Sequence, residues 1–179
     1  MQADLTLDDS YINLVAHRVD LAVRIGTLTD SSDIVRRVGA TRRLAVASPS
    51  YLETTGIPQR PDDLISKRLI SFTSLTPARS WRFFGDGPEQ EVPVNPTYTT
   101  NSADAAIWHA CNGGGVTMVL SYQVEHLVRD GLLQIVLENF EPRPYPIQLV
   151  YPSARHLSPK VRAFVDLVAE TQQWSFLDL

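Results

Sequence analysis

The residues best suited to chemistry are Thr99, Thr100, Asn101 and Ser102, because they stand where a predicted strand runs into a predicted helix. In an open α/β sheet, ligands lodge at the carboxyl ends of strands and face the N-termini of helices. The unpaired backbone N–H groups and the helix dipole at such a place favour an anion, for example a carboxylate. Ser102 is equally well placed to cap the following helix. This corner therefore predicts a carboxylate site, a helix cap, or both.

Catalysis would need nucleophiles, bases or metal ligands at suitable spacings, and the sequence offers no such constellation. The histidines at 17, 109, 126 and 156 have no metal-binding spacing with one another or with the single cysteine. There is no G-x-S-x-G elbow and no G-x-x-x-x-G-K-[ST] phosphate loop. We expect no enzymatic activity, no cofactor and no metal site.

Three local patterns have structural explanations. His109 and Cys111 lie two apart on a predicted helix, so their side chains point about 200° apart and cannot pair. A structural cysteine is the better interpretation of Cys111. Residues 113–115, all glycine, follow a helix and predict its C-terminal cap. The acidic pairs at 8–9 and 62–63 stand near helix starts and indicate capping, not an acid/base dyad.

The composition indicates an ordinary globular protein of one domain or two small lobes. The chain has 179 residues, 44% hydrophobic and 20% charged, with one cysteine, which favours a reducing compartment. No apolar run approaches a membrane span, and residues 1–5 do not resemble a secretory signal, so we expect a cytoplasmic location.

The net charge of −4 argues against DNA binding by this chain itself. Two dibasic pairs, Arg36–Arg37 and Arg42–Arg43, interrupt this acidic balance. We interpret both pairs as a solvated edge around a strand.

The N-terminal third predicts a β-α-β unit. Residues 19–26 combine apolar and β-branched types and predict a mostly buried strand of a parallel sheet. Residues 5–7 predict a strand and residues 11–16 a short helix, so we expect an α/β fold with right-handed crossovers. Arg24, near the end of the buried strand, either faces the same ligand-binding cleft or forms a salt bridge on the sheet rim.

Further elements follow at short intervals. Residues 141–146 contain three alternating prolines and predict an irregular crossing linker. Phe72, Trp81 and Trp108 either pack in the core or line an aromatic-acid pocket. Strands are expected at 43–47, 68–72, 97–100, 116–120, 132–137 and 147–151, and a hairpin at 81–94. Helices are expected at 48–56, 62–64, 103–111, 123–129 and from 158. The last helix has one apolar face, formed by Val161, Phe164, Val165 and Val168.

The order of several short motifs resembles the effector-binding domain of LysR-type transcriptional regulators along nearly the whole chain. The motifs are Asp20-Leu21-Ala22-Val23-Arg24-Ile25-Gly26, Leu28, Asp30-Ser31-Ser32, Arg36-Arg37, Ala47-Ser48-Pro49-Ser50-Tyr51-Leu52, Gly56-Ile57-Pro58, Pro61-Asp62-Asp63-Leu64, Asn101-Ser102, Val150-Tyr151-Pro152 and Leu157-Ser158-Pro159 leading to Phe164.

This resemblance implies a type II periplasmic-binding-protein-like fold with two α/β lobes and two crossover linkers. The crossings should fall near residues 40–43 and 142–147, with lobe one formed by 1–42 plus 146–179 and lobe two by 43–145. It also implies a small effector, often an organic acid, bound between the lobes of a homo-oligomer. By position, the residues bordering that cleft are Arg24, Gly26, Ser71, Phe72, Thr100, Asn101 and Ser102.

Two departures from the family pattern are expected. The DNA-binding winged helix-turn-helix is absent from this sequence, so DNA would be bound only through a segment outside it. The first strand and first helix of the effector domain are also absent, which leaves lobe one incomplete and its flank exposed. We expect another copy or a rearranged N-terminus to cover that flank. Two alternatives are a stand-alone solute-binding protein of the same fold and a transferase or lyase on a similar fold.

Overall fold

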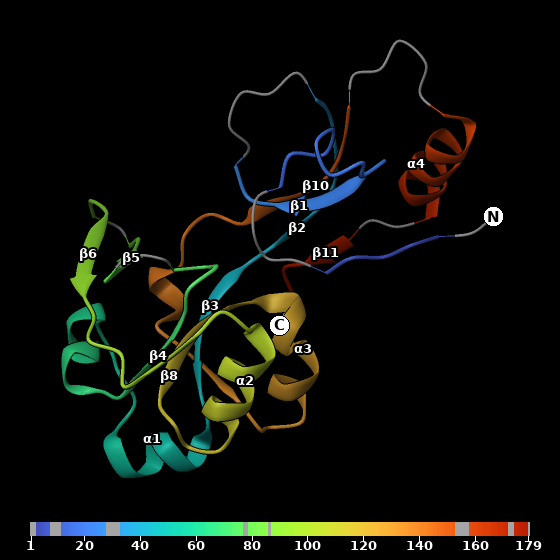
Figure 1. The fold of residues 1–179 in the computed structure, drawn as a ribbon. Helices are drawn as coiled ribbons and strands as arrows, with labels where there is room; N and C mark the ends of the chain where they lie inside the picture. Colours follow the sequence, from blue (N-terminus) through green and yellow to red (C-terminus); the bar gives the residue numbers. More distant parts are fainter. Residues whose placement is uncertain are drawn as a thin grey trace. The chain divides into compact units, whose positions relative to one another are not determined.

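The computed structural model divides the chain into two compact units. It describes residues 3–7, 12–27, 33–76, 79–85, 87–152, 158–171 and 174–178 (Figure 1). Unit 1 consists of Met1–Thr41 and Tyr145–Asp178, and unit 2 consists of Arg42–Pro144. The chain enters unit 2 between Thr41 and Arg42 and returns between Pro144 and Tyr145. Both points lie within the ranges predicted for the crossings, 40–43 and 142–147, and the predicted lobe boundaries fall one residue later at each.

Unit 1 contains a four-stranded sheet in the order β1-β10-β2-β11. The strands are β1 (Ala22–Ile25), β2 (Ile34–Thr41), β10 (Tyr145–Tyr151) and β11 (Trp174–Phe176), and only the β2–β11 pair is parallel. Helix α4 (Pro159–Thr171) covers one face of this sheet. Its buried residues Val161, Val165 and Val168 pack against Ile147 and Leu149 of β10, which follows from their helical spacing.

The predicted N-terminal β-α-β unit is wrong. Residues 5–7 are irregular and exposed, and residues 14–18 form turns, not a helix. Segments this short cannot hold regular structure without a packing partner. Strand β1 pairs antiparallel with β10 and lies at the edge of the described sheet, with Val23 49% exposed. It is therefore not the buried parallel strand that its apolar residues indicated.

Three features of unit 1 were not predicted from the sequence. Strand β2 was missed because its first four residues are exposed and include two arginines. Strand β11, of three residues, was also missed. Pro146 belongs to β10, although its segment was predicted to be irregular; its carbonyl accepts a hydrogen bond from the Gly26 amide at 3.0 Å. Leu28, Asp30–Ser32 and the acidic pair at 8–9 lie outside the described residues.

Unit 2 is built on a five-stranded mixed sheet in the order β7-β4-β8-β3-β9. The β7–β4 and β4–β8 pairs are parallel, and β8–β3 and β3–β9 are antiparallel. The strands are β3 (Arg43–Ala47), β4 (Leu69–Phe72), β7 (Tyr98–Thr100), β8 (Val116–Leu120) and β9 (Gln134–Val136). All five agree in position with predicted strands to within a few residues, and β8 is buried along its whole length.

Helices cover both faces of this sheet, so each face has its own core. On one face, α2 (Ala103–Cys111) and α3 (Ser121–Arg129) pack through Ala106, Ile107, Val124 and Leu127 (Figure 1). On the other face lie α1 (Pro49–Thr55), the 3-10 turn η1 (Pro61–Ser66) and a separate hairpin of β5 (Ser80–Phe83) and β6 (Gln90–Pro93). The hairpin was predicted from its glycine-rich turn.

The predicted capping residues of α1 and η1 are confirmed. The Ser48 side chain accepts a hydrogen bond from the Tyr51 amide, and Gly56 ends α1. The Asp63 carboxylate accepts hydrogen bonds from the Arg60 and Gln59 amides at 2.9 and 2.8 Å, which lower its pKa. Capping is therefore the role of this acidic residue.

Two apolar residues were expected in the core but are partly exposed. Trp108 on α2 is 59% exposed, and Phe164 on α4 is 38% exposed. Both occupy helix positions just outside the buried stripe. By contrast, Phe72 and Trp81 are buried as expected, at 3% and 1% exposure.

Gly115 is the position in unit 2 least able to accept a side chain. Its φ is +145°, and an added Cβ would lie 2.2 Å from the carbonyl oxygen of Arg68. Gly131 has φ +73° with open space around it. We predict that Gly115→Ala destabilises the chain by about 3 kcal/mol or more, and Gly131→Ala by about 1 kcal/mol. Urea denaturation measures both, and equal small losses would contradict the close approach of Arg68.

Candidate ligand-binding site

The candidate site in unit 2 is framed by two parallel strands that end together. Ser71 and Phe72 of β4 are in register with Thr99 and Thr100 of β7. The Thr73 amide and hydroxyl both donate to the Thr100 carbonyl oxygen, at 2.9 and 3.3 Å. These bonds hold the carboxyl ends of β4 and β7 side by side, at the edge where ligands lodge in α/β sheets.

Helix α2 begins directly at this edge. The Ser102 amide donates to Thr100 Oγ1 at 3.1 Å, and Ser102 Oγ accepts from the Ala105 amide at 3.3 Å. Ser102 is therefore the N-cap, as predicted. The amides of Ala103 and Asp104, in the first turn, have no acceptor within the helix. They point out of the helix N-terminus and can donate to an anion.

The five predicted residues of unit 2 differ in which of their groups are accessible at the candidate site. Phe72 packs in the core under α2, so only its backbone borders the site. Ser71 points to the opposite face of β4, is 5% exposed, and its hydroxyl has no hydrogen bond to any residue the structure describes. Thr100 is half-buried, and Asn101 and Ser102 are exposed. The accessible polar groups are thus the Asn101 and Ser102 side chains and the first amides of α2.

Asp104 gives the same helix turn a negative charge. It is exposed and lies in the first turn of α2, where a carboxylate is stabilised by the helix dipole. Its charge opposes the approach of a second anion to the same amides. Sequence reasoning missed this residue, although an acid two positions after a capping serine is a visible signal.

The two predicted residues of unit 1 come together at the end of β1. The Arg24 guanidinium donates to the carbonyl oxygen of Ile12. Gly26 has φ +105°, a conformation that favours glycine, and its carbonyl oxygen accepts from Gln148 Nε2 at 2.8 Å. Arg24 and Gln148 are register partners, so this corner is tied together by β10.

A charged cluster in unit 2 was missed entirely. Arg42 Nε and one terminal nitrogen donate to the two carboxylate oxygens of Glu141, each at 2.8 Å, and the same nitrogen donates to Glu138 at 2.7 Å. The Arg42 and Glu141 side chains are only 13% and 12% exposed. The prediction of a solvated edge is therefore wrong for Arg42, whereas Arg36 and Arg37 are exposed as expected.

Burial and ion pairing act in opposite directions on this pair. Burial raises the pKa of the Glu141 carboxyl, and the Arg42 guanidinium beside it works against that rise. Hydrogen bonds from Arg42 to Glu141 raise the pKa of Arg42 above its already high value. Arg42 is therefore always charged, and removing one carboxylate would leave a poorly solvated cation.

Leu137, just before this cluster, has a strained backbone. Its φ and ψ are 59° and 32°, in the left-handed region that costs a leucine about 1–2 kcal/mol. It precedes the 3-10 turn η2 (Glu138–Phe140) and is 7% exposed. Strain of this kind persists only where the surrounding contacts maintain it.

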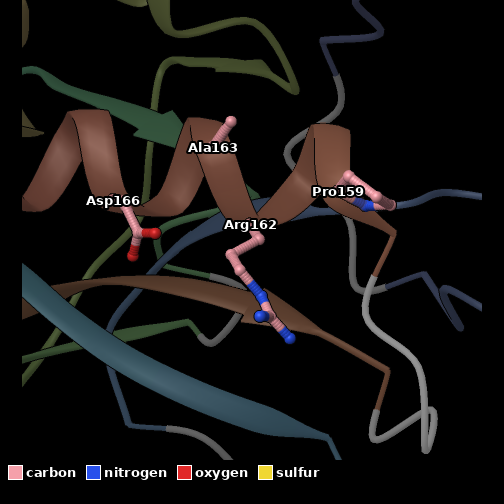
Figure 2. A pocket seen from close by; sticks show the side chains of 4 residues that line it. All are labelled: Pro159, Arg162, Ala163 and Asp166. Atoms are coloured by element: carbon pink, nitrogen blue, oxygen red, sulfur yellow. The ribbon is translucent and has the colours of Figure 1, made fainter.

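Two hollows in the described surface lie away from the predicted site residues. One, of about 370 Å³, runs along α4 and is lined by Pro159, Arg162, Ala163 and Asp166 (Figure 2). All four residues come from one helix, and Asp166 already pairs with Arg36 at 3.5 Å. The other, of about 190 Å³, lies in unit 2 and is lined by residues 57–59 and 135–140. Neither gathers convergent polar groups as a ligand site does.

The residues considered for catalysis are explained by structure. His109 packs against Tyr98, with ring centroids 4.6 Å apart. Cys111 is half-buried, and burial raises the pKa of its thiol, which opposes formation of the nucleophilic thiolate. Among the described residues, no group of three histidine, cysteine or acidic side chains could hold a metal ion. No helix in the described part of the chain is long and apolar enough to cross a membrane.

Comparison with known proteins decides the family. Residues 1–173 match the family described as LysR substrate binding domain. The chain belongs to this family. This confirms the resemblance seen in the motifs, whose segments now occupy both units. The regulatory domain of CrgA, a LysR-type transcriptional regulator from Neisseria meningitidis, matches this LysR substrate binding domain with a TM-score of 0.79 and 27% identity, over 91% of this chain and 80% of that domain. The expected α/β, periplasmic-binding-protein-like fold is thereby confirmed.

The curated relatives of this LysR domain are transcriptional regulators. An HTH-type transcriptional regulator of Xanthomonas campestris pv. campestris is 33% identical over 172 residues, covering 94% of this chain and 50% of the relative. The HTH-type transcriptional regulator PtxR of Pseudomonas aeruginosa is 31% identical over 172 residues, covering 95% of this chain and 54% of PtxR. The chain thus spans about half the length of the curated relatives it matches.

The cap of α2 can be tested separately from ligand binding. We predict that Ser102→Ala lowers the free energy of unfolding by about 1 kcal/mol, because the Ala105 amide loses its acceptor. Ser102→Asp should retain most of the stability, since aspartate caps as well as serine. Denaturant titration of both variants measures the difference, and equal losses would show that the hydroxyl does not act as a cap.

Proposed function

We propose that this LysR-family chain is an effector-sensing domain that binds a small organic acid at the N-terminus of α2. The observation that carries the proposal is the meeting of the β4 and β7 carboxyl ends with the first amides of α2, in a family of regulatory domains. The ligand carboxylate accepts hydrogen bonds from the Ala103 and Asp104 amides, and Asn101 and Ser102 add side-chain contacts. Ser71 and Thr100 border this position, as does the backbone of Phe72. We propose Arg24 and Gly26 of unit 1 as further effector-binding residues.

The wider role follows from the relatives. We propose that ligand binding alters how a DNA-binding segment outside this chain holds DNA, and that the regulator works in the cytoplasm. We also propose that the chain catalyses no reaction. The relatives are transcriptional regulators, which favours this role over that of a stand-alone solute-binding protein or a transferase.

The proposed carboxylate contacts can be removed without breaking the helix. Ala103 is the first residue of α2, a position where proline is favoured, and Ser102 before it is already extended. Ala103→Pro deletes one donating amide, so we predict carboxylate affinity to fall about 10- to 100-fold, the equivalent of a hydrogen bond to a charged group. A thermal-shift screen with acetate, succinate and benzoate identifies a ligand, since a ligand at about 100 times its Kd stabilises by about 2.7 kcal/mol. Titration of the variant then gives the change.

A matched variant should act in the opposite direction. Asp104→Asn removes the negative charge from the same turn, so carboxylate affinity should rise about two- to fivefold. Uncharged amides of the same acids are the ligand controls and should not bind measurably tighter to this variant. A carboxylate that binds wild type, Ala103→Pro and Asp104→Asn equally would place the ligand elsewhere. No shift with any acid would contradict an organic-acid effector.

We further propose that a second copy covers the edge of the unit 1 sheet. Strand β1 is the edge strand of the described sheet and leaves Val23 49% exposed, and such edges pair readily with other chains. We predict a homo-oligomer in sedimentation velocity and its weakening by Val23→Lys. A wild-type chain that stays monomeric and soluble at high concentration would overturn this proposal.

A further inference from the structure

The chain crosses between the units twice, and contacts within each unit bring the two crossing segments together. In unit 1, Thr41 and Tyr145 are register partners in the β2–β10 ladder. In unit 2, Arg42 is the first residue after one crossing, and Glu141 stands three residues before the other. We call Arg42, Glu138 and Glu141 the crossing clamp. Its bidentate Arg42–Glu141 pair joins the two crossings through side chains just where the backbone ladder stops.

The two carboxylates of the crossing clamp are aligned by the turn that carries them. Glu138 begins η2 and Glu141 caps it. Residues three apart eclipse one another in a 3-10 helix, so both carboxylates project to the same side. The left-handed conformation of Leu137 directs the chain into this turn. The fold thus keeps a strained residue where it brings two acids to one arginine.

Arg42 itself is anchored to the body of unit 2. Its amide donates to Ser121 Oγ at 3.0 Å, and its carbonyl oxygen accepts from the Ser121 amide at 2.9 Å. Ser121 is fully buried at the start of α3. Arg42 also precedes β3, an interior strand of the sheet. Arg42 is therefore fixed in position, and its ion pair restrains the segment around Glu141.

We propose that the crossing clamp sets how freely the two units move relative to each other. Between Glu141 and Tyr145 the returning chain has only residues 142–144, and Pro142 and Pro144 have fixed φ angles. With Glu141 held, little rotational freedom remains in that crossing. When the bidentate pair opens, the nearest remaining restraint is the hydrogen bond from the Phe84 amide to the Phe140 carbonyl oxygen, at 2.8 Å, so the crossing gains the freedom of Glu141. The clamp limits movement between the two units, and this role does not depend on which ligand the chain binds.

Distance distributions between spin labels test the crossing clamp. In a Cys111→Ser background, cysteines replace the exposed residues Glu170 in unit 1 and Glu53 in unit 2. Glu141→Gln removes the bidentate carboxylate, and we expect a broader distribution of inter-unit distances by double electron–electron resonance. Glu138→Gln is the matched control, because it removes the same charge from a side chain that is 61% exposed and makes one bond. We expect it to leave the distribution close to wild type.

A second label pair separates clamp release from general loosening. Labels at Glu53 and His126, both in unit 2, should keep a narrow distribution in every variant. If Glu141→Gln does not fold, Arg42→Lys replaces it, since lysine keeps the charge but cannot form the two-pronged pair. The proposal is overturned if the inter-unit distribution is unchanged in these variants, if Glu138→Gln broadens it as much, or if the distances within unit 2 broaden too.

Discussion

The buried charge of Arg42 is the constraint on which the organisation of unit 2 depends. A guanidinium that is nearly withdrawn from water needs carboxylates and hydrogen bonds around it. It obtains them from Glu141 and Glu138, about a hundred residues later in the chain. Ser121 holds the backbone of the same residue from the start of α3. Through these ion pairs and hydrogen bonds, one residue connects the beginning of β3, the beginning of α3 and the end of the unit.

The candidate ligand site has a different physical basis, since it relies on backbone groups and little on charge. Register between β4 and β7 places two strand ends together, and α2 starts there with its first amides facing outward. Asp104 occupies the same turn, and its negative charge repels an approaching anion. A ligand that binds there must gain more from the amides and from Asn101 and Ser102 than it loses to this repulsion.

The two proposals concern different parts of one role, that of a sensing domain in a chain of the LysR substrate binding domain family. A sensing domain needs a place for the ligand and a means of transmitting its binding. The N-terminus of α2 is the proposed place, and the crossing clamp lies where the chain passes between the units. Both lie in or beside segments held by short-range hydrogen bonds, which keep their geometry while other parts move.

Local patterns predicted unit 2 well and unit 1 poorly. Ser48, Ser102 and Gly56 mark helix ends by rules that need only neighbouring residues, and the helices are found there. The run at 19–26 was apolar enough for a buried strand, yet β1 lies at a sheet edge because its burial depends on which strands come beside it. Strand β2 gave no apolar signal, since its first half is exposed and its partner β10 is distant in sequence.

The sequence by itself determined the family, the fold class and the α2 corner, because motif order, apolar runs and capping residues are local properties of the chain. Only the tertiary structure decided that Arg42 is a buried ion-pair partner and that Phe72 faces the core. Those outcomes depend on contacts between residues far apart in the chain. No local pattern records such contacts, since they exist only after the sheet has formed.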